Sequence, residues 1–206
     1  MIALEKDSGI WTVTIDRPDK ANSLTEAMLA ELAEIAEAAE AEEARALILT
    51  GRGKVFSAGA DLDAARAGLA KSPLWERLSG AIAALPCLTI AALNGTVAGG
   101  AMGMVLACDL RIAVPGAKAF YPVMKLGFLP QPSDPGRLRA LVGPARAKLI
   151  LMAGHKATTD EAAAWSLFDR IAASPDTLLE EARALAADSL AAAPGHARAI
   201  KALCTS

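Results

Sequence analysis

One stretch constrains the fold more than any other part of this sequence: 94–109, which reads N-G-T-V-A-G-G-A-M-G-M-V-L-A-C-D. It follows an apolar, β-prone run at 88–93 and continues into small and apolar residues typical of a buried helix. The pattern therefore predicts a strand, a glycine turn and a helix start, an arrangement that points backbone N–H groups at an anion. Gly99 and Gly100 carry no side chain, so a ligand can approach the backbone there.

A second loop of the same kind lies earlier in the chain. The apolar run at 46–50, A-L-I-L-T, predicts a buried strand, and it leads into G-R-G-K-V-F-S-A-G-A-D-L at 51–62. Two strand-to-helix loops can aim two N–H groups at one oxygen, which is the architecture of an oxyanion hole for an enolate or a tetrahedral anion. Glycine-rich turns also bind phosphates or simply allow close packing, so the residues alone leave these alternatives open.

A dinucleotide-binding function can be excluded from the spacing. The fingerprint for that function needs G-x-G-x-x-G with an acidic residue about 20 positions further on. Here the glycines are Gly95, Gly99, Gly100 and Gly103, and the next acidic residue, Asp109, comes too soon.

The composition excludes further classes of protein. The chain has 206 residues, enough for one domain, and a net charge of −2, which gives no basic face for nucleic acid. Three cysteines without a C-x-x-C spacing indicate the reduced thiols of an intracellular protein. The first residues, M-I-A-L-E-K-D, carry charge where a secretory signal would be apolar, so we expect a cytoplasmic location.

A long uncharged span resembles a membrane segment only superficially. No charged residue occurs between Arg77 and Asp109, but Pro86, Asn94 and several glycines interrupt the span. No clean run of about 18 apolar residues remains, and the pattern favours the buried centre of a soluble fold.

The remaining signals predict a β/α core followed by an all-helical tail. Two β-prone runs at 2–6 and 10–15 flank D-S-G and predict a hairpin. Ser23 and Glu26 form a capping box that opens a helix ending near Ala41. Further on we expect a helix at about 73–85, a strand at 110–114, a loop rich in proline and glycine through 136, and then helices separated by breaks at 143–144, 154, 174–175 and 194–195.

Five motifs, taken in order, resemble the crotonase (enoyl-CoA hydratase/isomerase) superfamily. They are D-R-P-D-K-A-N-S-L, F-S-A-G-A-D-L, N-G-T-V-A-G-G-A-M-G followed by A-C-D, P-V-M-K-L-G-F-L-P, and the later G-H-K-A-T-T-D-E-A-A-A-W-S-L-F-D-R-I. Their order and separations are similar to those of the family, and the resemblance covers nearly the whole chain. It strengthens the oxyanion-hole interpretation of the two glycine loops.

The resemblance implies an α/β fold, a spiral of ββα units with a helical C-terminal segment. Residues 1–136 would form the core with an acyl-CoA site, and 137–206 a shortened helical segment used for trimerisation. The expected assembly is a homotrimer or a dimer of trimers. The expected ligand is an acyl-CoA thioester, with coenzyme A as part of the substrate and no separate cofactor.

The resemblance also assigns site residues by position. The two oxyanion-hole donors would be the amides of Ala60 and Gly100. The coenzyme A moiety would be contacted by Lys20, Ala21, Leu24, Ala58, Asp61 and Leu62. Arg17 or Lys20 would supply a cationic contact to its phosphates.

Two positions depart from the family pattern. Hydratases of the family use two glutamates: the first would stand three residues after Gly100, at Gly103, and a gapless count from Asp109 places the second at Val123, after Pro122. Neither side chain can move a proton, and a positioned acid or base contributes about 10²–10⁴-fold. Efficient hydration by the usual route is therefore not expected.

Two other residues are candidates for the missing acid or base. Asp134 lies in the loop where some family members place an aspartate, although a turn-forming aspartate is the simpler interpretation. Tyr121 could donate a proton, although packing explains it as well. Helix capping accounts for Asp61, and a structural hydrogen-bond role is expected for Asp109.

The remaining candidates point to no other chemistry. His155 and His196 lie outside the core motifs, are expected to face solvent and have no metal-ligand spacing, so no metal site is predicted. Ser57 lacks the G-x-S-x-G context of a serine hydrolase. A final set of residues is expected to pack the acyl tunnel or the core: Met102, Met104 and Met124.

Two classes of function remain open. The first is an enzyme that stabilises an acyl-CoA enolate, for which decarboxylation, thioester hydrolysis or a hydration using Asp134 or Tyr121 would fit. The second is a non-catalytic acyl-CoA binding protein. A purely structural subunit fits less well, because a decayed site would not need the close backbone approach that both glycine loops allow.

Overall fold

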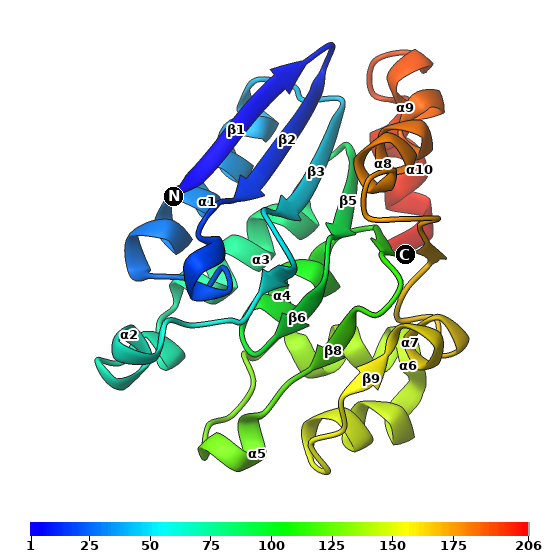
Figure 1. Cartoon of the computed structure of the whole chain (residues 1–206). Helices are drawn as coiled ribbons and strands as arrows, with labels where there is room; N and C mark the ends of the chain where they lie inside the picture. Colours follow the sequence, from blue (N-terminus) through cyan, green and yellow to red (C-terminus); the bar gives the residue numbers. More distant parts are fainter. Residues whose placement is uncertain (206) are drawn as a thin grey trace.

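The computed structural model describes residues 1–205 of the 206 and shows two sheets flanked by helices (Figure 1). The larger sheet has the strand order β1-β2-β3-β5-β7-β10. Its strands are β1 (Ile2–Asp7), β2 (Ile10–Ile15), β3 (Ala46–Gly51), β5 (Leu88–Leu93), β7 (Leu110–Ala113) and β10 (Arg170–Ile171). The smaller sheet, β4-β6-β8-β9, consists of β4 (Val55–Ser57), β6 (Thr96–Ala98), β8 (Lys118–Phe120) and β9 (Ala157–Thr158).

The chain winds through these sheets as a spiral of ββα units. In each turn a strand of the larger sheet is followed by a short strand of the smaller sheet and then by helix: β3, β4 and α2–α3; β5, β6 and α4; β7, β8 and α5. Successive turns pair in parallel: β3 with β5 and β5 with β7 in the larger sheet, and β4 with β6 and β6 with β8 in the smaller one. The expected fold class is therefore confirmed.

The helices cover both faces of the larger sheet. α3 packs against α1 and α4, and α8 packs against β5 and β7. In Figure 1 the last helices stand beside β5, away from α1 and α3. The helices are α1 (Glu26–Ala41), α2 (Leu62–Arg66), α3 (Leu74–Ala84), α4 (Ala101–Ala107), α5 (Val123–Leu126), α6 (Asp134–Leu151), α7 (Thr159–Ala164), α8 (Leu178–Leu185), α9 (Ala187–Ala191) and α10 (His196–Thr205).

The core sits where the parallel strands meet α4. Every residue of β3 and of α4 is buried. Parallel strands that are covered on both faces read as continuous apolar runs rather than alternating ones, which is why A-L-I-L-T was recognisable in the sequence. No helix within residues 1–205 is both long and apolar enough to cross a membrane.

The N-terminal hairpin and the ends of α1 and α3 lie within a residue or two of the positions predicted from the sequence. The residue predicted to cap α1 was wrong. Thr25, not Ser23, caps this helix, and its side chain accepts a hydrogen bond from the amide of Met28. The reason is that Leu24 is held extended in a bridge with Ala60, so the helix cannot begin earlier. Ser23 instead contacts the guanidinium of Arg17.

The tail is not all-helical, contrary to the sequence-based expectation. β9 pairs antiparallel with β8, and β10 pairs parallel with β7. Each has two residues, too short for a period-2 pattern to be visible in a sequence. The predicted break at Gly143 is real but lies inside α6, where this glycine is non-helical with φ 78°.

Candidate active site

The two glycine loops meet at a cavity of about 130 Å³. It is lined by Ala58, Ala60, Gly99, Gly100, Tyr121 and Val123, among others. A larger cavity of about 600 Å³ lies between β5, α6 and α10. We take the smaller cavity as the candidate site, because it alone of the two is bordered by both loops, whereas Asp109 in the larger one is already bonded to Thr89 and Lys201.

Two backbone amides at the smaller cavity are left without partners. The amides on either side are used: Asp61 N donates to Leu24 O at 2.8 Å, and Gly99 N donates to Phe120 O at 3.1 Å. Within the described residues, the amides of Ala60 and Gly100 donate no hydrogen bond. Both residues are half-buried. Two backbone donors at a single cavity that no protein acceptor uses can serve a ligand oxygen.

Backbone packing holds these two loops together. Gly59 has φ +89°, and a Cβ atom on it would lie 2.8 Å from Ala98 O and 3.3 Å from Gly100 N. A side chain at position 59 would therefore push the loops apart as well as strain the backbone. Behind Gly100 stands Trp75, whose ring would lie 3.0 Å from a Cβ added there.

Trp75 was not singled out from the sequence. It is buried, lines the cavity, and donates its indole N–H to Leu69 O at 2.8 Å. In the sequence it is one apolar residue on the inner face of a predicted helix, and no local signal distinguishes it from an ordinary core residue.

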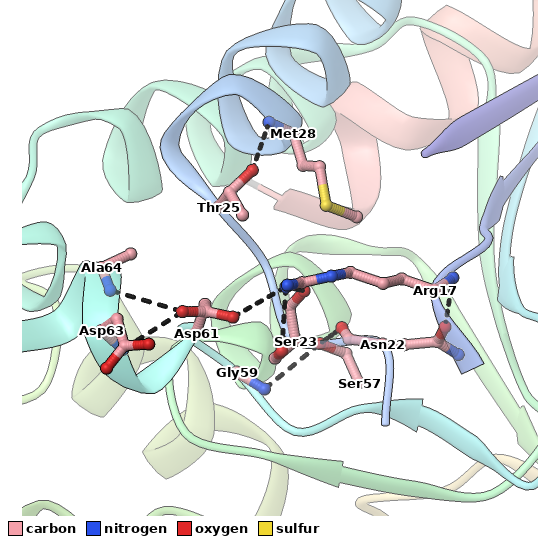
Figure 2. Close-up of polar contacts among 10 residues, drawn as sticks. All are labelled: Arg17, Asn22, Ser23, Thr25, Met28, Ser57, Gly59, Asp61, Asp63 and Ala64. Atoms are coloured by element: carbon pink, nitrogen blue, oxygen red, sulfur yellow. Dashed lines mark hydrogen bonds and ion pairs between the residues drawn. The ribbon is translucent and has the colours of Figure 1, made fainter. Parts of the chain in front are cut away.

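The ion pair between Arg17 and Asp61 joins the turn at 17–23 to the start of α2 (Figure 2). The Arg17 guanidinium donates to Asp61 Oδ2 at 2.8 Å and to Ser23 O at 3.0 Å. Asp61 caps α2 by accepting from the amides of Asp63 and Ala64. The hydrogen bond from Arg17, with help from these amides, holds the pKa of Asp61 below its usual value. The expected capping role of Asp61 is confirmed, and Arg17 is engaged within the protein.

Asn22 organises the turn that precedes the cavity, as Figure 2 shows in part. It adopts a left-handed conformation with φ 53°. Its side chain accepts from Arg17 N at 2.8 Å and donates to the carbonyls of Arg52 and Val55. Ser57 Oγ donates to Asn22 O and accepts from Gly59 N, so this hydroxyl supports the loop. The structure gives Ser57 a role in positioning the loop and no partner of the serine-hydrolase kind.

The residues expected to contact coenzyme A divide into two groups. Ala58 and Leu62 line the cavity together with Ala60. The other four belong to the neighbouring turn or to its contacts and do not line the cavity: Lys20, Ala21, Leu24 and Asp61. Met124, expected to pack the tunnel or the core, is 62% exposed, because the four-residue helix α5 points it to solvent; that expectation was wrong.

Tyr121 and Asp134 form a buried pair beside the cavity. Tyr121 lines the cavity, and its hydroxyl donates to Asp134 Oδ2 at 2.9 Å. Asp134 is 1% exposed and begins α6, so it is not an ordinary turn aspartate. Burial raises the pKa of Asp134 to about 6 and the pKa of Tyr121 well above its usual range. Asp134 itself does not line the cavity; it is connected to it through Tyr121.

A second carboxylate, which sequence reasoning missed, positions the start of α6. Glu76 on α3 accepts from Ser133 N at 3.1 Å and from Ser133 Oγ at 2.5 Å. Gln131 is fixed by a hydrogen bond from its Nε2 to Ala70 O. Glu76 and Ser133 are 57 positions apart in the chain, so the sequence holds no local signal for this contact.

The remaining candidates are structural. Asp109 accepts from the amide and hydroxyl of Thr89 and from Lys201, so its predicted hydrogen-bonding role is confirmed. His155 is half-buried against Glu161 and Trp165 rather than facing solvent. No cluster of three metal-ligating side chains occurs among residues 1–205.

Comparisons with known proteins agree with this fold. The sequence matches the enoyl-CoA hydratase/isomerase family over residues 5–205. It is 34% identical to a carnitinyl-CoA dehydratase of Salmonella arizonae, over 97% of this chain and 78% of that protein. It is 31% identical to 4-chlorobenzoyl coenzyme A dehalogenase-2 of an Arthrobacter species, over 95% and 74% of the two chains.

A solved structure is similar over almost the whole chain. The enoyl-CoA hydratase of Bacillus anthracis superposes with a TM-score of 0.91 at 30% identity, covering 99% of this chain and 82% of that one. Family match, relatives and fold agree, and the chain therefore belongs to the enoyl-CoA hydratase/isomerase family of the crotonase superfamily.

Proposed function

We propose that this protein binds an acyl-CoA with the thioester carbonyl oxygen on the amides of Ala60 and Gly100, and stabilises the enolate of that thioester. The observation that carries the proposal is the pair of unpartnered amides at one cavity. An enolate concentrates negative charge on that oxygen. Fixed donors in a site of low dielectric therefore favour the enolate over the neutral thioester, and one such donor contributes roughly 10²–10³-fold.

Membership of the family does not decide the reaction. The relatives named above include a dehydratase and a dehalogenase. At the two positions where the family resemblance implies glutamates, this chain has Gly103 and Val123. Val123 lines the cavity and cannot carry a proton. The proposal therefore covers enolate stabilisation and leaves aside hydration by two glutamates.

A carbonyl-specific spectrum tests the placement of the thioester. Butyryl-CoA labelled with ¹³C at the carbonyl is titrated into the protein and followed by infrared difference spectroscopy. Hydrogen bonding to both amides should shift the C=O stretch to lower frequency. Binding without a shift would overturn the placement of the thioester oxygen on the two amides. The protein would then be one that binds coenzyme A without polarising the thioester.

A matched pair of glycine variants sharpens this test. Gly59→Ala introduces a Cβ 2.8 Å from Ala98 O, so the loops separate and the carbonyl shift should disappear. Gly116→Ala is the control, because Gly116 also has a positive φ, +81°, but nothing lies within 4 Å of its added Cβ. Equal loss in both variants would attribute the effect to backbone strain alone.

An assay of turnover separates hydration from the other reactions. A panel of 2-enoyl-CoAs is followed by loss of the conjugated-thioester absorbance. We expect no hydration at ordinary enzyme rates, above about 1 s⁻¹. Turnover at such rates would contradict the inference from Gly103 and Val123.

A further inference from the structure

The carboxylate of Asp134 on α6 occupies the space beside Gly103 on α4 that a side chain at position 103 would fill. A Cβ atom on Gly103 would lie 2.8 Å from Asp134 Oδ1 and 3.1 Å from Oδ2. A glycine inside a helix destabilises it by roughly 1 kcal/mol relative to alanine. Here the space without a side chain is filled by a carboxylate from another helix. The missing side chain in α4 and the buried acid in α6 are therefore two parts of one arrangement.

The surroundings of Asp134 leave it one polar route to the cavity. Its Oδ2 accepts from the Tyr121 hydroxyl, and its Oδ1 has no hydrogen-bond partner within the described residues. The charged groups that act on it are Arg137, on its own helix, and Glu76, on α3, while α4 contributes no charge. A proton can therefore pass between the Asp134 carboxyl and the cavity only through the Tyr121 hydroxyl.

We propose that Tyr121 and Asp134 are the acid–base pair of this site, with Tyr121 touching the substrate and Asp134 acting through it. This inference rests on the proposed function. The α-carbon C–H bond of the bound acyl-CoA breaks, and its proton goes to Tyr121 Oη. The hydroxyl proton of Tyr121 passes to Asp134 Oδ2. The electron pair of the C–H bond becomes the enolate, whose oxygen lies on the Ala60 and Gly100 amides, and the reverse steps return a proton to carbon.

The two-residue arrangement follows from their acidities. Burial raises the pKa of Tyr121, so a free tyrosinate does not form at neutral pH and Tyr121 cannot act as a base alone. Asp134, with its pKa raised to about 6, is mostly ionised at pH 7 and yet more basic than an exposed aspartate. A base with a pKa near the working pH is the efficient kind.

Exchange of the α-hydrogens of butyryl-CoA in D₂O tests the pair without requiring any net reaction. Mass spectrometry follows deuterium incorporation, and isothermal titration measures binding of the same compound. Tyr121→Phe and Asp134→Asn should each slow exchange about 100-fold or more, with the dissociation constant changed by less than about threefold. Asp160→Asn, an exposed aspartate in the first turn of α7, is the matched control and should leave both unchanged.

A pH profile distinguishes the proton-accepting role of Asp134 from a packing role. In the unaltered protein, exchange should rise about tenfold per pH unit and level off above a midpoint near the pKa of Asp134, about 6. In Asp134→Asn this dependence should vanish. If Asp134→Asn fails to fold, Tyr121→Phe and the profile of the unaltered protein decide the question.

The outcomes separate this inference from the proposed function. Binding of butyryl-CoA with a shifted carbonyl but no exchange, or exchange that Tyr121→Phe leaves intact, overturns the acid–base pair alone. Failure to bind butyryl-CoA overturns both. Slow exchange in both variants, with binding preserved and the profile lost in Asp134→Asn, supports the pair.

Discussion

Asp61 and Asp134 both stand at the start of a helix beside the same cavity, yet their surroundings are opposite. Asp61 is partly exposed and accepts from a guanidinium and two amides, so its pKa is lowered. Asp134 is buried, accepts one hydrogen bond from a phenol, and its pKa is raised to about 6. Helix position favours the charged form in both cases. The partners and the burial of each carboxyl therefore decide whether it is a structural anion or a group able to exchange a proton.

The two carboxyls also belong to differently built regions. The region of Asp61, which we call the N-terminal turn network, comprises Arg17, Asn22, Ser23, Ser57 and Asp61 and is held by directional polar contacts (Figure 2). The region of Asp134 has hydrogen bonds from Tyr121 to Asp134 and from Ser133 to Glu76, and it adds close packing of a glycine on one helix against a carboxylate on another. Substitutions should therefore act differently in the two regions.

The largest expected effect is in the N-terminal turn network. Asn22→Ala removes three hydrogen bonds from a residue that is fully buried, and it places alanine at φ 53°. Lost hydrogen bonds that leave buried groups unpaired cost about 1–3 kcal/mol each, so we expect roughly 3–5 kcal/mol of lost stability. Urea denaturation gives the value. A loss below about 1 kcal/mol would show that water replaces these bonds without penalty.

The pH dependence of stability should come next. The folded pKa of Asp134 is raised from 3.8 to about 6, so the folded chain holds this proton more tightly than the unfolded chain. Its contribution is fully present below pH 4 and is lost as the pH rises through about 6, by roughly 3 kcal/mol at 1.36 kcal/mol per unit. Denaturation of the protein and of Asp134→Asn at pH 4 and pH 7.5 measures it.

Asp61 supplies the contrast for that experiment. Because its folded pKa is lowered, its contribution is present above the unfolded value and is lost as the pH falls. The pH-dependent part of stability should therefore change in opposite directions in Asp61→Asn and Asp134→Asn. The same direction in both would contradict the assigned environments.

A smaller effect is expected where α4 meets α6. Gly103→Ala forces the Asp134 carboxylate to move, and overpacking of this kind costs about 1–3 kcal/mol. Asp134→Ala in the same chain removes the clash and should recover most of that loss, giving a coupling energy of roughly 1–2 kcal/mol in a double-mutant cycle. Additive effects would show that the two residues do not share this space.

The smallest effect is expected for the half-buried ion pair of the N-terminal turn network. Arg17→Ala removes the ion pair to Asp61. The side chain of Arg17 is 25% exposed and that of Asp61 is 18% exposed. Because pairs of this kind are screened by solvent and salt, we expect about 1 kcal/mol or less, falling further at 1 M salt. Thermal denaturation at two salt concentrations measures it. A loss that does not depend on salt would assign the effect to the bond from Arg17 to Ser23 O.

The sequence predicted the elements whose signals are local. The apolar runs of β3 and β5, the hairpin, and the cap at Asp61 are all contained in short windows. It did not predict Trp75 behind Gly100 or Glu76 beneath Ser133, because both contacts join positions far apart in the chain.

Asp134 lies between these two cases. Its position in a loop with a glycine, prolines and a serine favours a turn, and only the three-dimensional structure shows that it is buried against Gly103. In the sequence the space appears only as a single glycine, Gly103, while the residue that fills it, Asp134, is 31 positions further on. Propensities and periodicities do not connect the two.

Asn22 also bears on how the protein ages chemically. Asparagine loses its amide when the next backbone nitrogen attacks the side chain, and that nitrogen, Ser23 N, is bound to Lys20 O at 3.0 Å. The Asn22 side-chain amide is itself held by two carbonyls, so the folded state slows this loss of the amide. Molecules that do convert would present a carboxylate to those same carbonyls. These molecules would lose the turn irreversibly. The working lifetime of a stored sample should therefore be longer the more rarely this turn opens.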